Sequence, residues 1–238
     1  MIRAAAFAIC CATPALATPP DIIGVTDQLF GISADSIFVL RHVFDNHGVH
    51  EQEQRDLLLV VLDRKTRAET IWPVYRARNG ADYERDADLD RRYRIAPIDL
   101  DDQIDPYAKL REAEGIPIGP SWIPDGHEAT IQMSGDLVTL TDEDGKRFGQ
   151  DETSLHKQRL AALIRTGETL GDYGRMNGLT ITDLLIGMDY WQESCAYTDG
   201  FRFERMLGSA PTAMIRASCT DGAEGQEWSL ITLLPPMK

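Results

Sequence analysis

The first seventeen residues constrain the rest of this chain more than any other segment, because they indicate the compartment in which it folds. Arg3 precedes a run of small and apolar residues over 4–12, which is followed by the helix breaker Pro14 and by Ala-Leu-Ala at 15–17. This order is typical of a secretory signal peptide that is cleaved after residue 17. The apolar run is too short to cross a bilayer, which takes about 20 helical residues.

Cleavage at that point divides the chain into a signal peptide over 1–17 and a single exported β-rich domain over 18–238, within which 18–150 and 151–238 are candidate sub-lobes. A mature chain of about 220 residues is long enough for one domain with a sizeable core. We expect this domain in the periplasm or outside the cell, with no membrane insertion after cleavage.

The cysteines fit an oxidising compartment. Cys10 and Cys11 leave with the signal peptide, so the mature chain keeps Cys195 and Cys219. An even pair in an exported protein predicts one disulfide, and closing a loop of about 25 residues would stabilise the fold by about 3.5 kcal/mol. The alternative is two unpaired cysteines in the core.

The charge of the chain excludes two classes of partner. It carries 38 acidic and 24 basic residues, a net charge of −14 at pH 7. Such a charge repels nucleic-acid phosphates and anionic membrane surfaces, so we expect no nucleic acid or membrane as partner. The expected partner is an unidentified protein or a component of the cell envelope.

β-Strand patterns dominate the first third of the mature chain. The segment 37–44 is rich in β-branched and aromatic residues and predicts a strand. Its two faces are Phe38, Leu40, His42 and Phe44 on one side, and Val39, Arg41, Val43 and Asp45 on the other. Since His42 shares a face with phenylalanines, we expect it to be a core histidine. Further strands are expected over 57–62 and 69–75, the latter at a sheet edge because it contains Pro73.

Helix signals mark two segments. Asp105 and Pro106 suit the N-cap and first position of a short helix that ends before Gly115. Ser154 and Gly167 suit the start and stop of a longer helix. The expected apolar stripe of this longer helix is formed by Leu160, Leu163 and Ile164.

The segments between and after these helices again predict strands. Asp144-Gly145 is a hairpin signal that follows strand-like segments over 129–133 and 137–140. Four more strands are expected over 189–197, 201–207, 213–219 and 227–234, which would place the two cysteines on the first and third strands. Such strands lie about 10 Å apart, whereas a disulfide needs Cα atoms within about 7 Å. A bridge therefore favours pairing out of sequence order.

These patterns predict an α+β fold that is β-dominated, with antiparallel meander sheets and one or two short surface helices. A chain of this kind has room for one continuous core.

One loop concentrates metal-binding chemistry. The segment 45–53 contains Asp45, His47, His50, Glu51 and Glu53, whose imidazole nitrogens and carboxylates suit zinc, copper or nickel. The spacing matches no established zinc signature, so the alternative is a solvated polar connection. No cofactor is expected apart from this candidate divalent metal.

Other candidate sites are weaker. Trp122 lies between prolines in a loop and is the tryptophan we expect to face a partner. Asp86, Asp88 and Asp90 resemble the opening of a calcium loop, but Arg91 stands where that loop needs glycine. The sequence has no Gly-x-Ser-x-Gly nucleophile motif.

The leading functional hypothesis is therefore a non-enzymatic exported binding or interaction protein of unknown partner. One alternative is a metal-binding protein that uses the loop at 45–53. Another is a hydrolase of envelope polymers whose catalytic carboxylates no local pattern identifies.

Overall fold

The computed structural model describes residues 22–47, 53–79, 95–118, 126–171, 180–187, 194–203, 212–220 and 227–237. The predicted signal peptide, Trp122 and the candidate calcium loop at 86–90 lie outside these residues, as do His50 and Glu51 of the candidate metal loop. No helix in the described part of the chain is both long enough and apolar enough to cross a bilayer.

The N-terminal half of the main sheet is an antiparallel meander. It consists of β1 (Ile23–Ile32), β2 (Ser36–Asp45), β3 (Gln54–Asp63) and β4 (Glu69–Asn79), each hydrogen-bonded to the next. The short strand β5 (Ile95–Ile98) pairs only with the last four residues of β4. Pro73 lies in the part of β4 that β5 does not reach, beside a register shift, which is where a strand tolerates a residue without an N–H group.

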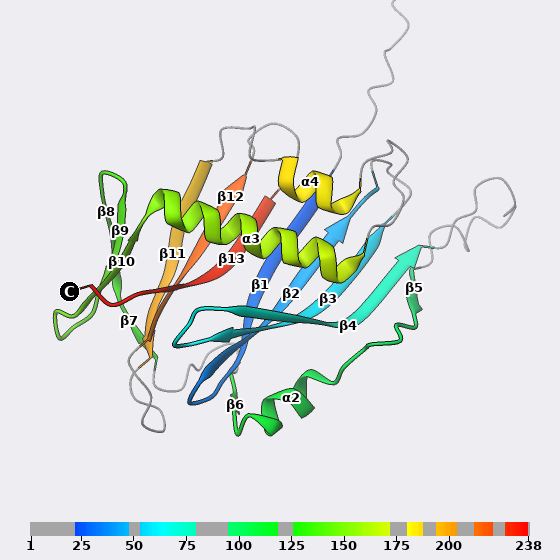
Figure 1. Ribbon diagram of the computed structural model, residues 1–238, viewed down its shortest axis with the longest axis horizontal. Coiled ribbons are helices and arrows are strands. Elements are labelled where there is room, and N and C mark those ends of the chain that lie inside the picture. Colours follow the sequence, from blue (N-terminus) through cyan, green and yellow to red (C-terminus); the bar gives the residue numbers. More distant parts are fainter. Residues whose placement is uncertain are drawn as a thin grey trace, which may run out of the picture.

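The C-terminal half is a second meander that completes the same sheet. Its strands are β11 (Ser194–Phe203), β12 (Thr212–Thr220) and β13 (Glu227–Leu234), with β7 (Gly126–Glu128) beside β11. β13 pairs in parallel with β1, and this contact joins the two meanders, while β6 (Ile116–Pro117) adds to the end of β1 (Figure 1). A separate three-stranded sheet contains β8 (Thr130–Ser134), β9 (Leu137–Thr141) and β10 (Arg147–Asp151).

Three helices are described: α2 (Pro106–Glu112), α3 (Glu152–Leu170) and α4 (Ile181–Gly187). α3 runs across one face of the main sheet, with α4 next to its C-terminal half (Figure 1). One buried cluster combines Val39 and Val60 of the first meander with Met214, Ile231 and Leu233 of the second. Both halves of the sheet thus contribute to this cluster, while α3 packs on the sheet through a second cluster that contains its Ala162, Leu163 and Leu170.

The predicted fold class is confirmed, since strands dominate and antiparallel meanders build the main sheet. α2 begins as predicted, with Asp105 as N-cap and Pro106 in the first turn. The longer helix differs from its predicted bounds: its N-cap is Asp151, and it ends at Leu170 before Gly171. Gly167 lies inside the helix, where a Cβ atom would come within 2.5 Å of Thr182 Oγ1 on α4.

The buried stripe of α3 also differs from the predicted stripe. It is formed by Leu155, Arg159, Ala162, Leu163, Thr166, Gly167 and Leu170, whereas Leu160 and Ile164 are only half-buried. A prediction from apolar residues alone misplaced this stripe, because two of its buried members are polar. Arg159 and Thr166 both have polar partners within the structure, which allows their burial.

The alternation along β2 is confirmed, but the expected position of His42 in the core is wrong. Val39, Arg41, Val43 and Asp45 are buried, while His42 is exposed. The physical reason is that α3 and the second meander cover the face that contains Arg41. On the opposite face, α2 covers Phe38 through Leu110, and this cover does not reach His42.

The disulfide Cys195–Cys219 is present, with a Cα–Cα distance of 4.1 Å. The predicted break between strands at 198–200 is wrong. β11 continues through that segment with a register shift between Thr198 and Phe201, so Cys195 lies directly opposite Cys219 on the adjacent strand β12. The bridge therefore joins neighbouring strands that do pair in sequence order.

Candidate functional site

A charged layer crosses the core beneath α3, with a fully buried arginine at its centre. Arg41 on β2 donates from Nε to Asp27 Oδ1 at 2.7 Å and from Nη2 to Asp27 Oδ2 at 2.9 Å. The same Nη2 atom donates to Glu69 Oε1 at 3.0 Å. From Nη1, Arg41 reaches α3, where it donates to Thr166 Oγ1 at 2.9 Å. One side chain thus connects three strands with the helix.

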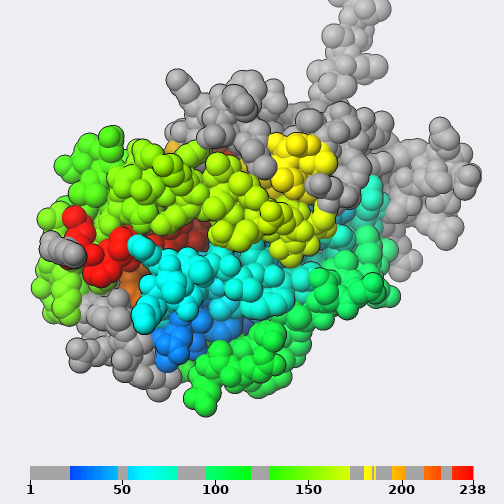
Figure 2. Space-filling view, in the orientation of Figure 1, coloured from blue at the N-terminus to red at the C-terminus, as the bar shows by residue number. Residues whose placement is uncertain are grey.

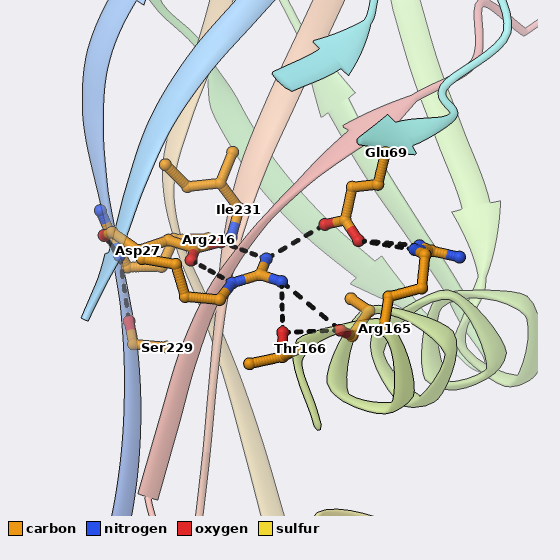
Figure 3. A network of polar contacts seen from close by, with 9 residues as sticks. Asp27, Glu69, Arg165, Thr166, Arg216, Ser229 and Ile231 are labelled. Atoms are coloured by element: carbon orange, nitrogen blue, oxygen red, sulfur yellow. Dashed lines mark hydrogen bonds and ion pairs between the residues drawn. The ribbon is translucent and has the colours of Figure 1, made fainter. Parts of the chain in front are cut away.

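Each carboxylate of this layer has a further donor. Glu69 Oε2 accepts from Nη2 of Arg165 at 2.7 Å, and Asp27 Oδ2 accepts from the backbone N–H of Ile231 at 3.0 Å (Figure 3). Arg216 on β12 donates to the backbone oxygen of Asp27 at 2.7 Å. The layer therefore extends from β4 across the sheet to the second meander.

The surroundings of Arg41 hold this side chain in its charged form. Burial alone lowers the pKa of Arg41, but the charges and hydrogen bonds of Asp27 and Glu69 outweigh burial and raise that pKa above its ordinary value. Arg41 and Arg165 balance the two carboxylates in formal charge, while Arg216 forms its ion pair with Asp199. Apolar clusters lie on both sides along β2, with Val43 in one and Val39 in the other, so water has little access to the ion pair of Arg41 and Asp27.

A pocket of about 280 Å³ opens beside this layer, between α3, the connection from β3 to β4, and β13. Figure 2 looks onto this region, where red atoms of the C-terminal strand are visible between yellow-green α3 and the cyan β3–β4 segment. The apolar lining consists of Leu62, Ala68, Ala161, Ala162, Leu230, Ile231 and Leu233. The polar lining consists of Arg67, Glu69, Lys157, Gln158, Arg159, Arg165 and Thr232.

The charge of the pocket is opposite to that of the whole chain. Four cationic side chains and one carboxylate line it, although acidic residues outnumber basic ones in the sequence by 38 to 24. The carboxylate, Glu69, has Arg41 on one oxygen and Arg165 on the other. Arg159 is buried and donates to the hydroxyl of Tyr197 at 3.3 Å. The pocket thus presents positive charge over an apolar floor.

A second polar cluster lies at the C-terminal end of α3. Asp56 on β3 accepts from Gln54 Nε2 at 2.8 Å and from Arg76, and Arg76 Nη2 donates to the backbone oxygen of Leu170 at 2.8 Å. Burial raises the pKa of Asp56, an effect that its two donors only partly offset and that the nearby charge of Asp45 reinforces. This cluster attaches the end of α3 to the sheet.

The candidate metal loop is only partly described. Asp45 and His47 are buried, and the backbone N–H of His47 donates to Asp45 Oδ1 at 2.7 Å. Glu53 forms an ion pair with Arg55. Among the described residues, no group of three or more His, Cys, Asp or Glu side chains could hold a metal ion. Because His50 and Glu51 lie outside those residues, metal binding by this loop stays a prediction.

Sequence reasoning missed both the charged layer and the pocket. Their residues come from segments around 27, 41, 62–69, 157–165 and 230–233, which no local motif connects. One signal was available. Arg41 shares a strand face with Val39 and Val43, and an arginine on such a face needs buried carboxylates as partners if that face is the core.

No protein-family model matches the chain, and comparisons with curated proteins and with solved structures also give no match. The pocket and the charged layer are therefore the features of this chain that bear on its function.

Proposed function

We propose that this protein is an exported binding protein that takes up a small ligand in the pocket between α3, the β3–β4 connection and β13. The observation that carries the proposal is the pocket itself, which combines an apolar floor with a few polar side chains that converge on it. This combination is typical of small-molecule sites. The Cys195–Cys219 disulfide supports an oxidising compartment.

The hydrogen bonds of Glu69 favour binding over acid–base catalysis. Arg41 occupies one oxygen of this carboxylate and Arg165 occupies the other. A general base must accept a proton from its substrate, and three of the acceptor positions of this carboxylate are already taken by donors of the two arginines. Glu69 instead orients two arginines, one of which lines the pocket.

The size of the pocket limits the ligand. An engineered cavity of about 150 Å³ takes up benzene, so a pocket of this volume suits a ligand of roughly ten non-hydrogen atoms. A ligand of that size could be held by contacts with α3 on one side and β13 on the other.

The test is to fill the pocket with a side chain. Ala161 lines the pocket from α3, so Ala161→Trp should block it, while Thr153→Trp on the exposed side of the same helix serves as the matched control. A library of small fragments is screened by thermal shift against the three oxidised proteins. A ligand at about 100 times its Kd adds about 2.7 kcal/mol, which raises Tm by roughly 5–10 °C for a domain of this size.

The expected result is a set of fragments that stabilise the original chain and Thr153→Trp but not Ala161→Trp. Both variants are first compared by urea unfolding, and Ala161→Phe replaces Ala161→Trp if the latter does not fold. If no fragment distinguishes the blocked variant from the control, the pocket is not a binding site and the proposal is wrong.

A further inference from the structure

The apolar floor of the pocket is formed by buried side chains. Leu62, Leu230, Ile231 and Leu233 line it, and each of these side chains is at most 4 % exposed. They belong to two of the buried clusters of the core, Leu230 to one and the other three to the second. A ligand that reaches this floor needs an apolar part, because a polar group placed there would lose its hydrogen bonds to water.

The mouth of the pocket is cationic. We use the term cationic rim for Arg67, Lys157 and Arg165, of which the first two are exposed residues and the third has a 40 % exposed side chain. Arg165 is shared with Glu69, whereas Arg67 and Lys157 form no ion pair with any residue in the described part of the chain. These two side chains add positive charge at the mouth, where Lys157 also interacts electrostatically with the nearby carboxylate of Asp151.

The β3–β4 turn determines the backbone conformation of Arg67. Its φ angle is 63°, in the left-handed region that costs a residue other than glycine about 1 kcal/mol or more. The preceding turn fixes this conformation, because Asp63 Oδ1 accepts from the N–H groups of Lys65 and Thr66 at 3.0 and 2.6 Å and from Thr66 Oγ1 at 2.8 Å. The turn thereby holds Arg67 at the place where its side chain lines the pocket.

Resting on the proposed binding function, we infer that the ligand is a small anionic amphiphile, with a carboxylate at the cationic rim and an aliphatic chain on the apolar floor. Arg67 and Lys157 contact the carboxylate, and charge-assisted hydrogen bonds of this kind are stronger than neutral ones. Octanoate has about the size that the pocket volume allows, and it is the probe of choice.

The experiment compares three probes that share one chain length: octanoate, 1-octanol and octylammonium. Their binding to the oxidised chain is measured by titration calorimetry, together with Arg67→Gln/Lys157→Gln. The matched control is Lys65→Gln, which removes an exposed cation of the same turn that does not line the pocket. We expect octanoate to bind most tightly, and the double variant to lose about tenfold in affinity for octanoate while its affinity for 1-octanol is unchanged.

Salt provides a second readout. The preference for octanoate over 1-octanol should shrink as the salt concentration approaches about 1 M, where the Debye length is about 3 Å. Lys65→Gln should behave like the original chain throughout, and Ala161→Trp should weaken all binding.

The outcomes separate this inference from the proposed function. If 1-octanol or octylammonium binds as tightly as octanoate and Ala161→Trp abolishes that binding, the pocket binds ligands but the inference of an anionic ligand is overturned. If none of the three probes binds, the inference is also overturned, and the fragment screen decides independently about the binding function. An equal loss of octanoate affinity in Lys65→Gln and in the double variant would equally overturn the assignment of Arg67 and Lys157.

Discussion

Replacement of Arg41 by methionine tests whether the charged layer holds α3 on the sheet. Arg41 is fully buried and makes hydrogen bonds to Asp27, Glu69, Thr166 and the backbone oxygen of Ala162. Methionine fills much of the same space with an unbranched apolar chain. The variant leaves two buried carboxylates without their shared cation, and removing one partner of a buried pair costs about 3–5 kcal/mol.

A second substitution identifies the source of that loss. Asp27→Asn keeps an oxygen that can accept from the N–H of Ile231 but removes the negative charge. If the unpaired carboxylate causes much of the loss in Arg41→Met, the double variant should recover about 1–3 kcal/mol of it. Glu69 keeps Arg165 as a partner in both variants.

The assay is urea unfolding of the oxidised proteins at pH 7, with the slope m compared between variants to check that the same surface is exposed on unfolding. Arg55→Met is the matched control, because Arg55 lies on the adjacent strand with its side chain 61 % exposed and pairs only at the surface. The Arg55→Met variant should lose at most about 1 kcal/mol in free energy of unfolding. The reasoning is refuted if Arg41→Met costs no more than Arg55→Met, or if the double variant is less stable than Arg41→Met.

Three further predictions concern the rest of the fold. Reduction of Cys195–Cys219 should lower the free energy of unfolding by about 3.5 kcal/mol, whereas the double serine variant should show no response to reductant. Because burial raises the pKa of Asp56 above 3.8, the native state binds its proton more tightly than the unfolded state, so this group costs stability as the pH rises through its folded pKa. In urea unfolding, the stability of Asp56→Asn relative to the original chain should therefore increase from acid to neutral pH. An opposite trend would contradict a raised pKa of Asp56. Gly167→Ala should lower Tm, because the added Cβ would lie 2.5 Å from Thr182 Oγ1. This clash should outweigh the helix preference of alanine over glycine, which is about 1 kcal/mol. A raised Tm would show that α3 and α4 are not so close.

Local patterns predicted the elements whose signals are confined to a few neighbouring residues. The strands expected over 37–44, 57–62 and 69–75 all lie within observed strands. Asp105 caps α2 because its side chain accepts from the N–H of Tyr107, an interaction within three residues. The hairpin signal Asp144-Gly145 also lies at an observed turn, between β9 and β10.

The same patterns left the orientation of these elements open. Alternation along β2 defines two faces but not which one is covered, and α3 decided this from more than a hundred residues away by packing over Arg41. Similarly, the turn-like residues at 198–200 form a register shift within β11 and do not end the strand. Continuous pairing with β12 satisfies more backbone hydrogen bonds than a turn would. That continuity is what brings Cys195 opposite Cys219.

By itself the sequence determined the β-dominated class, the acidic surface charge and the composition that permits one disulfide. These properties follow from residue types and short spacings, which do not depend on what lies across the fold. Tertiary structure alone decided the charged layer around Arg41 and the pocket with its cationic rim. Both are assembled from segments up to two hundred residues apart, since burial of a charge and the shape of a cavity are properties of the packed sheet and helix together.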